Sequence, residues 1–313
     1  MANAVVLLGP QRHHPIVGSV LEDRGLRGPF ALITAGWQER EPEDEELREA
    51  IGGAPAVNLG IYRRFEKVVS EDAELASALH KRQEQLRELQ EIYRLRLGHL
   101  MAAARSLFDH AGPDELLAPE RSSALETVRQ LDRHHLARVE QVLRDFDEQM
   151  RPGERRAVLR QRSELAQAVQ DARAVLVAGG HVATLLNRMW IFGLDEQLRH
   201  RPVVAWSAGA MAVTERVVLF HDNPPQGPGH AELLTRGMGL CRGVLALPHG
   251  STRLRIDDPI RVALLARRFA ELRAVLLDPH RRVDWDPPRW VPGDRTRTLR
   301  TDGAIEVWEE DDA

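Results

Sequence analysis

Ser207 stands where an apolar, strand-like run ends and a run of small residues begins. The segment is Val203-Val204-Ala205-Trp206-Ser207-Ala208-Gly209-Ala210. A nucleophilic serine on a sharp strand-to-helix turn has this arrangement, because the turn is too tight for bulky neighbours. Such turns usually carry glycine two positions before and two after the nucleophile; here Gly209 is present and Ala205 replaces the first. The segment alone also fits a small-residue turn in which Ser207 only caps the next helix.

An aspartate and a histidine follow Ser207 in the order that many α/β hydrolases use. Asp222 lies in a turn before Pro224, and His249 ends an apolar run beside a glycine. Taken singly, they are an ordinary turn residue and an ordinary loop histidine. Together they predict that Ser207 attacks, that His249 takes its proton and that Asp222 orients the imidazole. Asp278, at the end of a later apolar run, is the reserve candidate for the carboxylate.

Gly179 and Gly180 separate an apolar strand-like run from a helical pattern. Two glycines let the backbone approach a ligand closely, and the unpaired N–H groups of a helix start can receive an anion or a developing oxyanion. A tight turn that packs helix on sheet is the structural alternative. The glycine pattern of a dinucleotide fold and the lysine of a phosphate loop are both missing, so we expect no cofactor.

The run from about residue 172 to 278 resembles the serine peptidase family of aspartyl dipeptidase (peptidase E) and cyanophycinase, which has a class I glutamine amidotransferase-like fold. Four segments carry the resemblance in order: Val177-Ala178-Gly179-Gly180, Trp206-Ser207-Ala208-Gly209-Ala210, the Asp222 turn, and Gly237-Met238-Gly239-Leu240 leading to Pro248-His249. The resemblance implies a peptidase that cleaves a peptide, isopeptide or related amide bond.

The same resemblance implies roles for individual residues. Ser207 would be the nucleophile, His249 the general base and Asp222 the third member of the triad. The backbone N–H groups of Gly180 and Ala208 would form an oxyanion hole. The chain departs from the family at His181, where asparagine is usual, and at Gly250, where an aromatic residue often follows the base. These departures affect substrate fit more than the chemistry.

Strand-like runs alternate with helical patterns, which predicts a parallel sheet covered on both faces. We expect a flavodoxin-like, class I glutamine amidotransferase-like three-layer α/β sandwich formed by residues 1–60 and 157–313. Active sites of open α/β sheets lie at the carboxyl ends of strands, where Gly9, Thr34, Gly179, Ser207 and His249 all fall. The expected strands are 4–8, 30–34, 56–59, 174–178, 203–206, 243–247 and 274–277; the expected helices are 15–24, 42–51, 181–199, 208–213 and 258–271; and a C-terminal hairpin spans Thr296 to Trp308.

Residues 61–156 form an insertion of a different kind, rich in Leu, Glu, Gln and Arg. Apolar residues recur three and four apart, first from Leu86 to Ala104 and again from Leu136 to Met150, which indicates two helices. Breaks at residues 110–113 and 151–153 make a long antiparallel helical hairpin the simplest shape. Two roles stay open: the hairpin packs on itself and shields the sheet, or it is an arm for homodimerisation or another partner.

Several polar residues fall where the pocket rim should lie. Substrate-binding candidates are Gln11, Arg12, Gly179, His181 and Arg253, the last placed to pair with a substrate carboxylate. A solvated surface role is the alternative for each arginine. Adjacent histidines, as at 13–14 and 134–135, would point about 100° apart on a helix and could not easily chelate one ion, so we expect no metal site.

The amino-acid composition of the chain excludes several classes of function. The chain has 313 residues and a formal net charge of −4, which argues against a nucleic-acid partner. Cys241 is the only cysteine, so no intrachain disulfide can form, and a cysteine nucleophile at the turn is excluded. Without a signal-like start or a membrane-length apolar run, a cytoplasmic location is expected. Two classes remain: a serine hydrolase acting on a small peptide or amide, and a non-catalytic or partner-dependent scaffold that works through its helical insertion.

Overall fold

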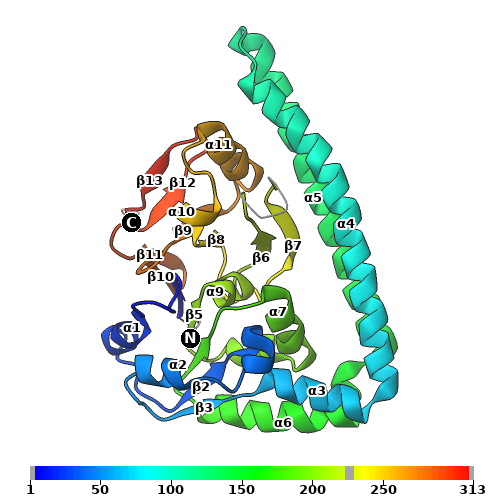
Figure 1. The fold of residues 1–313 in the computed structure, drawn as a ribbon, viewed down its shortest axis with the longest axis vertical. Coiled ribbons are helices and arrows are strands. Elements are labelled where there is room, and N and C mark those ends of the chain that lie inside the picture. The colour runs from blue at the N-terminus through cyan, green and yellow to red at the C-terminus, as the bar shows by residue number, and fades with distance from the viewer. Residues whose placement is uncertain (1–3, 223–228, 310–313) are drawn as a thin grey trace.

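The computed structural model describes residues 4–222 and 229–309 and shows a mixed α/β protein with a mainly parallel central sheet and a long helical region (Figure 1). The strands of the central sheet are β1 (Val5–Leu8), β2 (Phe30–Ile33), β3 (Ala56–Asn58), β4 (Ala174–Val177), β5 (Val203–Trp206), β10 (Arg282–Asp286) and β11 (Arg289–Pro292). Their order is β11-β10-β1-β5-β4-β2-β3. Strands β1 to β5 are parallel to one another. Strand β10 pairs with the other edge of β1 and runs antiparallel to it.

The central strands are apolar along their whole length because both faces of the sheet are covered. In β1, Val6 and Leu8 pack with one hydrophobic cluster, while Val5 and Leu7 pack with another. The first cluster includes residues of α1 (Val17–Asp23) and α2 (Glu45–Ala50), and the second includes residues of α7 (Val182–Ile191) and α9 (Ala208–Val213). This alternation has the period of two expected for a strand, and it produces a three-layer arrangement.

The prediction of a single parallel sheet was wrong for the last two expected strands. β8 (Val244–Pro248) and β9 (Arg273–Leu277) pair parallel with each other in a second sheet of order β13-β12-β9-β8. They cannot join the central sheet beside β1, because β10 occupies that side. The expected C-terminal hairpin is confirmed: β12 (Arg297–Leu299) pairs antiparallel with β13 (Ile305–Val307). The sequence reading missed β10 and β11 and the antiparallel pair β6 (Arg216–Leu219) and β7 (Glu232–Arg236).

Most expected helices are present with shorter ends. The expected helix over 181–199 is two helices, because Gly193 adopts a left-handed conformation with φ 61° between α7 and α8 (Leu194–Leu198). The other connecting helices are η1 (Ala35–Arg40), α3 (Ile61–Glu71), η2 (Pro152–Glu154), α6 (Arg156–Asp171), α10 (Gly250–Arg253) and α11 (Pro259–Arg268).

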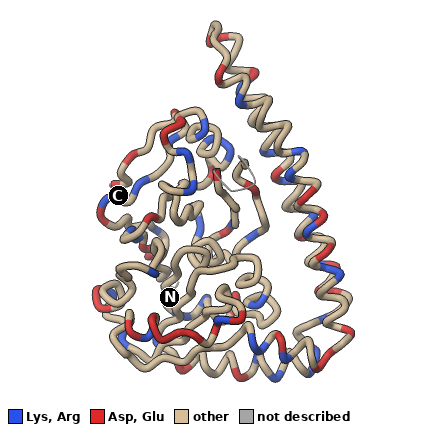
Figure 2. Tube along the Cα trace, in the orientation of Figure 1, with Lys and Arg blue, Asp and Glu red and all other residues tan. Residues whose placement is uncertain are grey.

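The helical hairpin consists of α4 (Ala73–Asp109) and α5 (Asp114–Met150), each 37 residues long and packed against the other. The two predicted breaks are confirmed, since α4 ends at Asp109 and α5 at Met150. The hairpin runs along one side of the molecule, and its tip extends past α11 (Figure 1). Basic and acidic residues alternate along its length (Figure 2). No helix in the described ranges is long and apolar enough to cross a membrane.

A buried polar network joins the middle of the hairpin to the rest of the protein. Arg268 of α11, almost fully buried, donates 2.7 Å and 2.6 Å hydrogen bonds to the two carboxylate oxygens of Asp132 on α5. Tyr93 of α4 donates to the same carboxylate at 2.8 Å and accepts from the backbone N–H of Leu233 in β7 at 3.1 Å. A buried ion pair needs such additional bonds to offset the loss of hydration. The hairpin is therefore docked on β7 and α11 and does not project freely along its whole length.

Candidate active site

Ser207 occupies a strained turn between β5 and α9. Its φ of 53° and ψ of −124° are rare for a residue with a side chain and cost about 1–3 kcal/mol. The turn is held because the Ser207 N–H donates to the carbonyl of Leu8 at 3.1 Å. It also needs Gly209, where a Cβ would lie 2.3 Å from the carbonyl oxygen of Val177. In the described chain the Ser207 hydroxyl has no hydrogen-bond partner, so its oxygen is free to react.

Gly179 and Gly180 lie directly against this turn. A Cβ on Gly179 would come within 2.8 Å of the Ser207 Cβ and 3.3 Å of the Ala208 nitrogen. Gly180 has φ 112°, and a Cβ there would lie 2.2 Å from the carbonyl oxygen of Gly36. The same carbonyl accepts a 2.7 Å hydrogen bond from the His181 N–H. Only glycine fits at 179 and 180, because the serine turn and the Gly36 backbone pack directly against them.

Gly36 is a site residue that the sequence reading missed. It lies in η1 just after β2, and a Cβ on it would be 2.4 Å from the carbonyl oxygen of Gly179. The sequence contains a pattern that points to Gly36, because Ala35-Gly36 is a pair of small residues just after an apolar, strand-like run.

The N–H groups of Gly180 and Ala208 have no hydrogen-bond acceptor within the described residues. Ala208 opens α9, and the first N–H groups of a helix lack partners inside the helix. A Cβ on Gly179, the residue before Gly180, would lie 3.2 Å from Ser207 Oγ and 3.3 Å from the Ala208 nitrogen, so the glycine pair borders both the serine side chain and the start of α9. Two such donors can stabilise negative charge on a carbonyl oxygen under attack.

His249 follows β8 in a left-handed conformation with φ 58° and begins α10. Its N–H donates to the carbonyl of Leu277 at 3.1 Å. The backbone carbonyl of the next residue, Asp278, packs closely against Gly9. A Cβ on Gly9 would lie only 1.9 Å from the Asp278 carbonyl oxygen. Since Gly9 follows Leu8, the backbone partner of Ser207, direct contacts connect the serine turn to the histidine turn.

The imidazole of His249 makes no hydrogen bond to Ser207 or to any other described residue. Burial, followed by the nearby Arg253 cation, lowers the pKa of His249, while the Asp278 carboxylate acts in the opposite direction. A lowered pKa keeps the ring neutral at neutral pH, as a general base requires.

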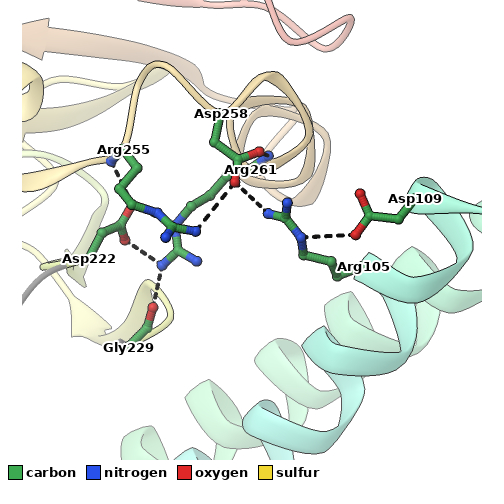
Figure 3. Close-up of polar contacts among 7 residues, drawn as sticks. All are labelled: Arg105, Asp109, Asp222, Gly229, Arg255, Asp258 and Arg261. Atoms are coloured by element: carbon green, nitrogen blue, oxygen red, sulfur yellow. Dashed lines mark hydrogen bonds and ion pairs between the residues drawn. The ribbon is translucent and has the colours of Figure 1, made fainter. Parts of the chain in front are cut away.

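The carboxylate of Asp222 contacts residues other than the histidine of the predicted triad. It is buried, and its two oxygens accept hydrogen bonds of 2.5 Å each from Nε and Nη2 of Arg261, while the backbone N–H of Arg255 donates to it at 2.8 Å (Figure 3). Its own N–H donates to the carbonyl of Arg253 at 2.7 Å. These contacts fix the chain between α10 and α11. Asp222 has no hydrogen bond to His249 and is not among the charges that shift the pKa of His249.

The reserve candidate, Asp278, is the carboxylate that acts on His249. Its oxygens accept hydrogen bonds from the backbone N–H of Ser251 at 2.9 Å, from the Ser251 hydroxyl at 2.5 Å and from Arg297 at 3.1 Å. The sequence reading named neither Ser251 nor Arg297 as partners. Arg297 is on β12, and nothing local in the sequence indicates that this strand pairs with β9.

The remaining candidates divide into structural and exposed residues. The side chain of Gln11 is used within its own loop, where its amide nitrogen donates to the Gly9 carbonyl at 2.9 Å and its oxygen accepts from two amides at the start of α1. His181 caps α7, with Nδ1 accepting from the Thr184 N–H at 3.2 Å. This bond leaves the exposed Nε2 as the protonated nitrogen. Arg12 and Arg253 are exposed and have no ion-pair partner in the described ranges.

The described residues include no cluster of metal ligands and no exposed thiol. No group of three or more His, Cys, Asp or Glu side chains in the described chain could hold a metal ion. Cys241 is buried, and burial raises the pKa of its thiol, which disfavours the reactive thiolate.

Comparisons with known proteins do not assign this chain to a family. No family model and no curated protein match the sequence. Among solved structures, the chain is similar to a peptidase from an acI-B1 Actinobacterium, with 14% sequence identity, a TM-score of 0.40 and 98% of each chain covered. A likeness at this identity and TM-score does not identify the chemistry of the site.

Proposed function

We propose that this protein is a serine hydrolase that cleaves a peptide, isopeptide or related amide bond. The observation that carries the proposal is the strained turn of Ser207, with φ 53° and ψ −124°, packed against Gly179. Backbone strain of this kind clusters at active sites, and a serine that only caps a helix does not need it. We assign the parts of the chain outside the hairpin, residues 1–60 and 157–313, to a flavodoxin-like, class I glutamine amidotransferase-like catalytic domain, and residues 61–156 to the insertion.

In the proposed reaction, Ser207 Oγ forms a bond to the carbonyl carbon of the substrate while its proton passes to His249. The carbonyl oxygen becomes an oxyanion and receives hydrogen bonds from the N–H groups of Gly180 and Ala208. When the intermediate collapses, the C–N bond breaks, and His249 returns the proton to the leaving amine. Water then releases the acyl group by the same steps. Catalytic hydrogen bonds are often long in free enzymes and tighten with substrate, so an unbonded His249 ring is compatible with this route.

We propose Asp278 in place of Asp222 as the carboxylate that supports the histidine. The support is electrostatic, because Asp278 raises the pKa of His249 and so stabilises the imidazolium that forms during attack. Ser251 and Arg297 hold Asp278 in position. Asp222 is left with a structural role at Arg261.

We propose that exposed polar groups around the site select the substrate. Arg12 and Arg253 are free to pair with a substrate carboxylate, since Arg is well suited to bidentate pairing. His181 is placed to donate from Nε2. The resulting preference is for a small peptide or amide that carries a carboxylate near the scissile bond.

Labelling with a fluorophosphonate probe tests the proposal. The wild-type protein should become covalently labelled, Ser207→Ala should abolish labelling, and Ser106→Ala, at an exposed position on α4, should label like the wild type. A folded wild-type protein that does not label would favour the alternative of a non-catalytic scaffold that works through its hairpin.

A further inference from the structure

A cavity of about 430 Å³ lies between the outer part of the hairpin and α11, and neither Ser207 nor His249 lines it. Its walls come from the end of α4, the first half of α5, one face of α11 and the Thr301-Asp302 turn between β12 and β13. The volume is in the range of small-molecule sites, and the position between two parts of a fold is where such sites are common.

Three arginines line this cavity, and main-chain carbonyls hold each of them. Arg121 donates to the carbonyls of Leu107 at 3.0 Å and His110 at 3.1 Å. Arg129 donates to the carbonyl of Arg267, and Arg267 donates to that of Thr301 at 2.6 Å. A carbonyl fixes a guanidinium without cancelling its charge, so the cavity wall presents ordered positive groups.

Three carboxylates lie around these arginines, and one of them, Asp302 on the cavity wall, is paired with Arg300 at 3.1 Å. Asp114 is 3.4 Å from Arg121 but its side chain is 86% exposed, and Glu126 is 3.7 Å from Arg129. Exposed pairs contribute little. Arg267 has no carboxylate partner in the part of the chain that the structure describes. The Nε of Arg129 is buried and has no hydrogen-bond partner among the described residues.

The same cavity has an aromatic and apolar wall. The guanidinium groups of Arg121 and Arg267 lie 5.6 Å and 5.5 Å from the centre of the Phe108 ring. Leu125 and Ile260 add aliphatic surface. Two cations at one ring repel each other, and an anion between them would relieve the repulsion. We propose that this cavity binds a small organic anion, with a phosphate or carboxylate group on the arginines and an apolar body against Phe108.

An anion bound here would bridge the hairpin and α11, beside a contact that already joins these two elements. At the start of α11, Asp258 accepts a 2.7 Å hydrogen bond from Arg105 of α4 (Figure 3). One turn further, Arg261 holds Asp222, which in turn fixes Arg255. Binding should therefore stabilise the folded protein, because the ligand bridges α5 and α11 only in that state.

Isothermal titration calorimetry at constant ionic strength tests the site with three probes that share a benzene ring: phenyl phosphate, benzoate and neutral benzyl alcohol. Saturable one-site binding of at least one anion is expected, with no binding of benzyl alcohol. The preferred anion shows whether phosphate or carboxylate is the group recognised. Arg267→Gln should weaken binding about tenfold or more, as the loss of a hydrogen bond to a charged group predicts. Arg138→Gln, an exposed position further along α5, should bind like the wild type.

A second variant tests the cavity without removing charge. Ala118 is exposed on the cavity wall, so Ala118→Trp should fold normally, fill the space and abolish binding. Circular dichroism confirms folding of each variant. The proposal is overturned if neither anion binds the wild type saturably, if Ala118→Trp binds as tightly as the wild type, or if Arg138→Gln weakens binding as much as Arg267→Gln.

Discussion

Arg261 and Asp222 form a two-point ion pair, with Nε and Nη2 of the arginine each 2.5 Å from a carboxylate oxygen. The aspartate is buried, and the pair closes the turn that carries the chain from α10 into α11. The Asp222 carboxylate is thus engaged by α11 and the turn before it. Among the charges that act on the pKa of His249, the carboxylate is that of Asp278.

The two carboxylates should respond differently to the same substitution. Asp222→Asn should lower the free energy of unfolding by about 1.5–3 kcal/mol, because it weakens hydrogen bonds to a charged partner, and should leave most of the hydrolysis rate of the folded protein. Asp278→Asn should lower kcat strongly. Urea unfolding and initial rates measured on both variants check this. A large loss of kcat in folded Asp222→Asn with normal rates in Asp278→Asn would restore the triad predicted from the sequence.

The pH dependence of hydrolysis should report the lowered pKa of His249. The base must be neutral, so kcat/KM should rise with pH and level off above a midpoint below the ordinary histidine value of about 6.5. Arg253 lowers this pKa, so Arg253→Gln should move the midpoint to higher pH. Asp278 raises it, so Asp278→Asn should move the midpoint to lower pH. Arg138→Gln is the control on the hairpin. A midpoint that neither Arg253→Gln nor Asp278→Asn moves would mean that another group limits the rate.

The serine turn could be predicted because its pattern is local. The expected strand 203–206 and helix 208–213 match β5 and α9, and the small residues around Ser207 directly reflect the space available there. Gly179 and Gly180 were found for the same reason. The hairpin was also found from local information, since two helices of 37 residues produce a clear apolar period.

The partner of His249 could not be predicted, because it depends on which strands pair. Asp222 and Asp278 are both aspartates near the ends of apolar runs. The parallel pairing of Pro248 with Leu277 places the next residues, His249 and Asp278, near each other. The Asp222 carboxylate instead forms an ion pair with Arg261, which lies 39 positions further along the chain. Neither contact has a sequence signal. Homodimerisation through the hairpin stays a prediction, although its middle is docked on α11 by Arg268 and Asp132.

Gly179→Ala should reduce catalysis while the protein still folds. The new methyl group would lie 2.8 Å from the Ser207 Cβ, so the nucleophile must move. A displacement near 1 Å at a reacting group can cost about a hundredfold in rate. Gly98→Ala is the matched control on α4, where a Cβ meets no atom within 4 Å and should add about 0.5–1 kcal/mol of stability. Probe labelling rates and thermal unfolding measure both effects. Unchanged labelling of Gly179→Ala would contradict the packing described for the site.

Asp132→Ala should strongly destabilise the protein. Arg268 would be left buried with an uncompensated charge, and breaking such a pair from one side costs about 3–5 kcal/mol. Glu148→Ala, an exposed position on the same helix, should change the free energy of unfolding by less than about 0.5 kcal/mol. Urea unfolding followed by circular dichroism compares the two. Equal, small effects would show that the network contributes little to docking the hairpin.

Ser207 and His249 should behave as one catalytic unit. Each of Ser207→Ala and His249→Ala should lower kcat/KM by about 10⁴-fold or more, because either change removes proton transfer during attack. The double variant should then be no worse than the more damaged single variant, since the second change removes a partner that no longer acts. Steady-state kinetics on a cleaved amide substrate, with circular dichroism to verify folding, measure the three losses. Losses that multiply would mean that Ser207 and His249 act in separate steps and would remove the basis for assigning them a shared mechanism.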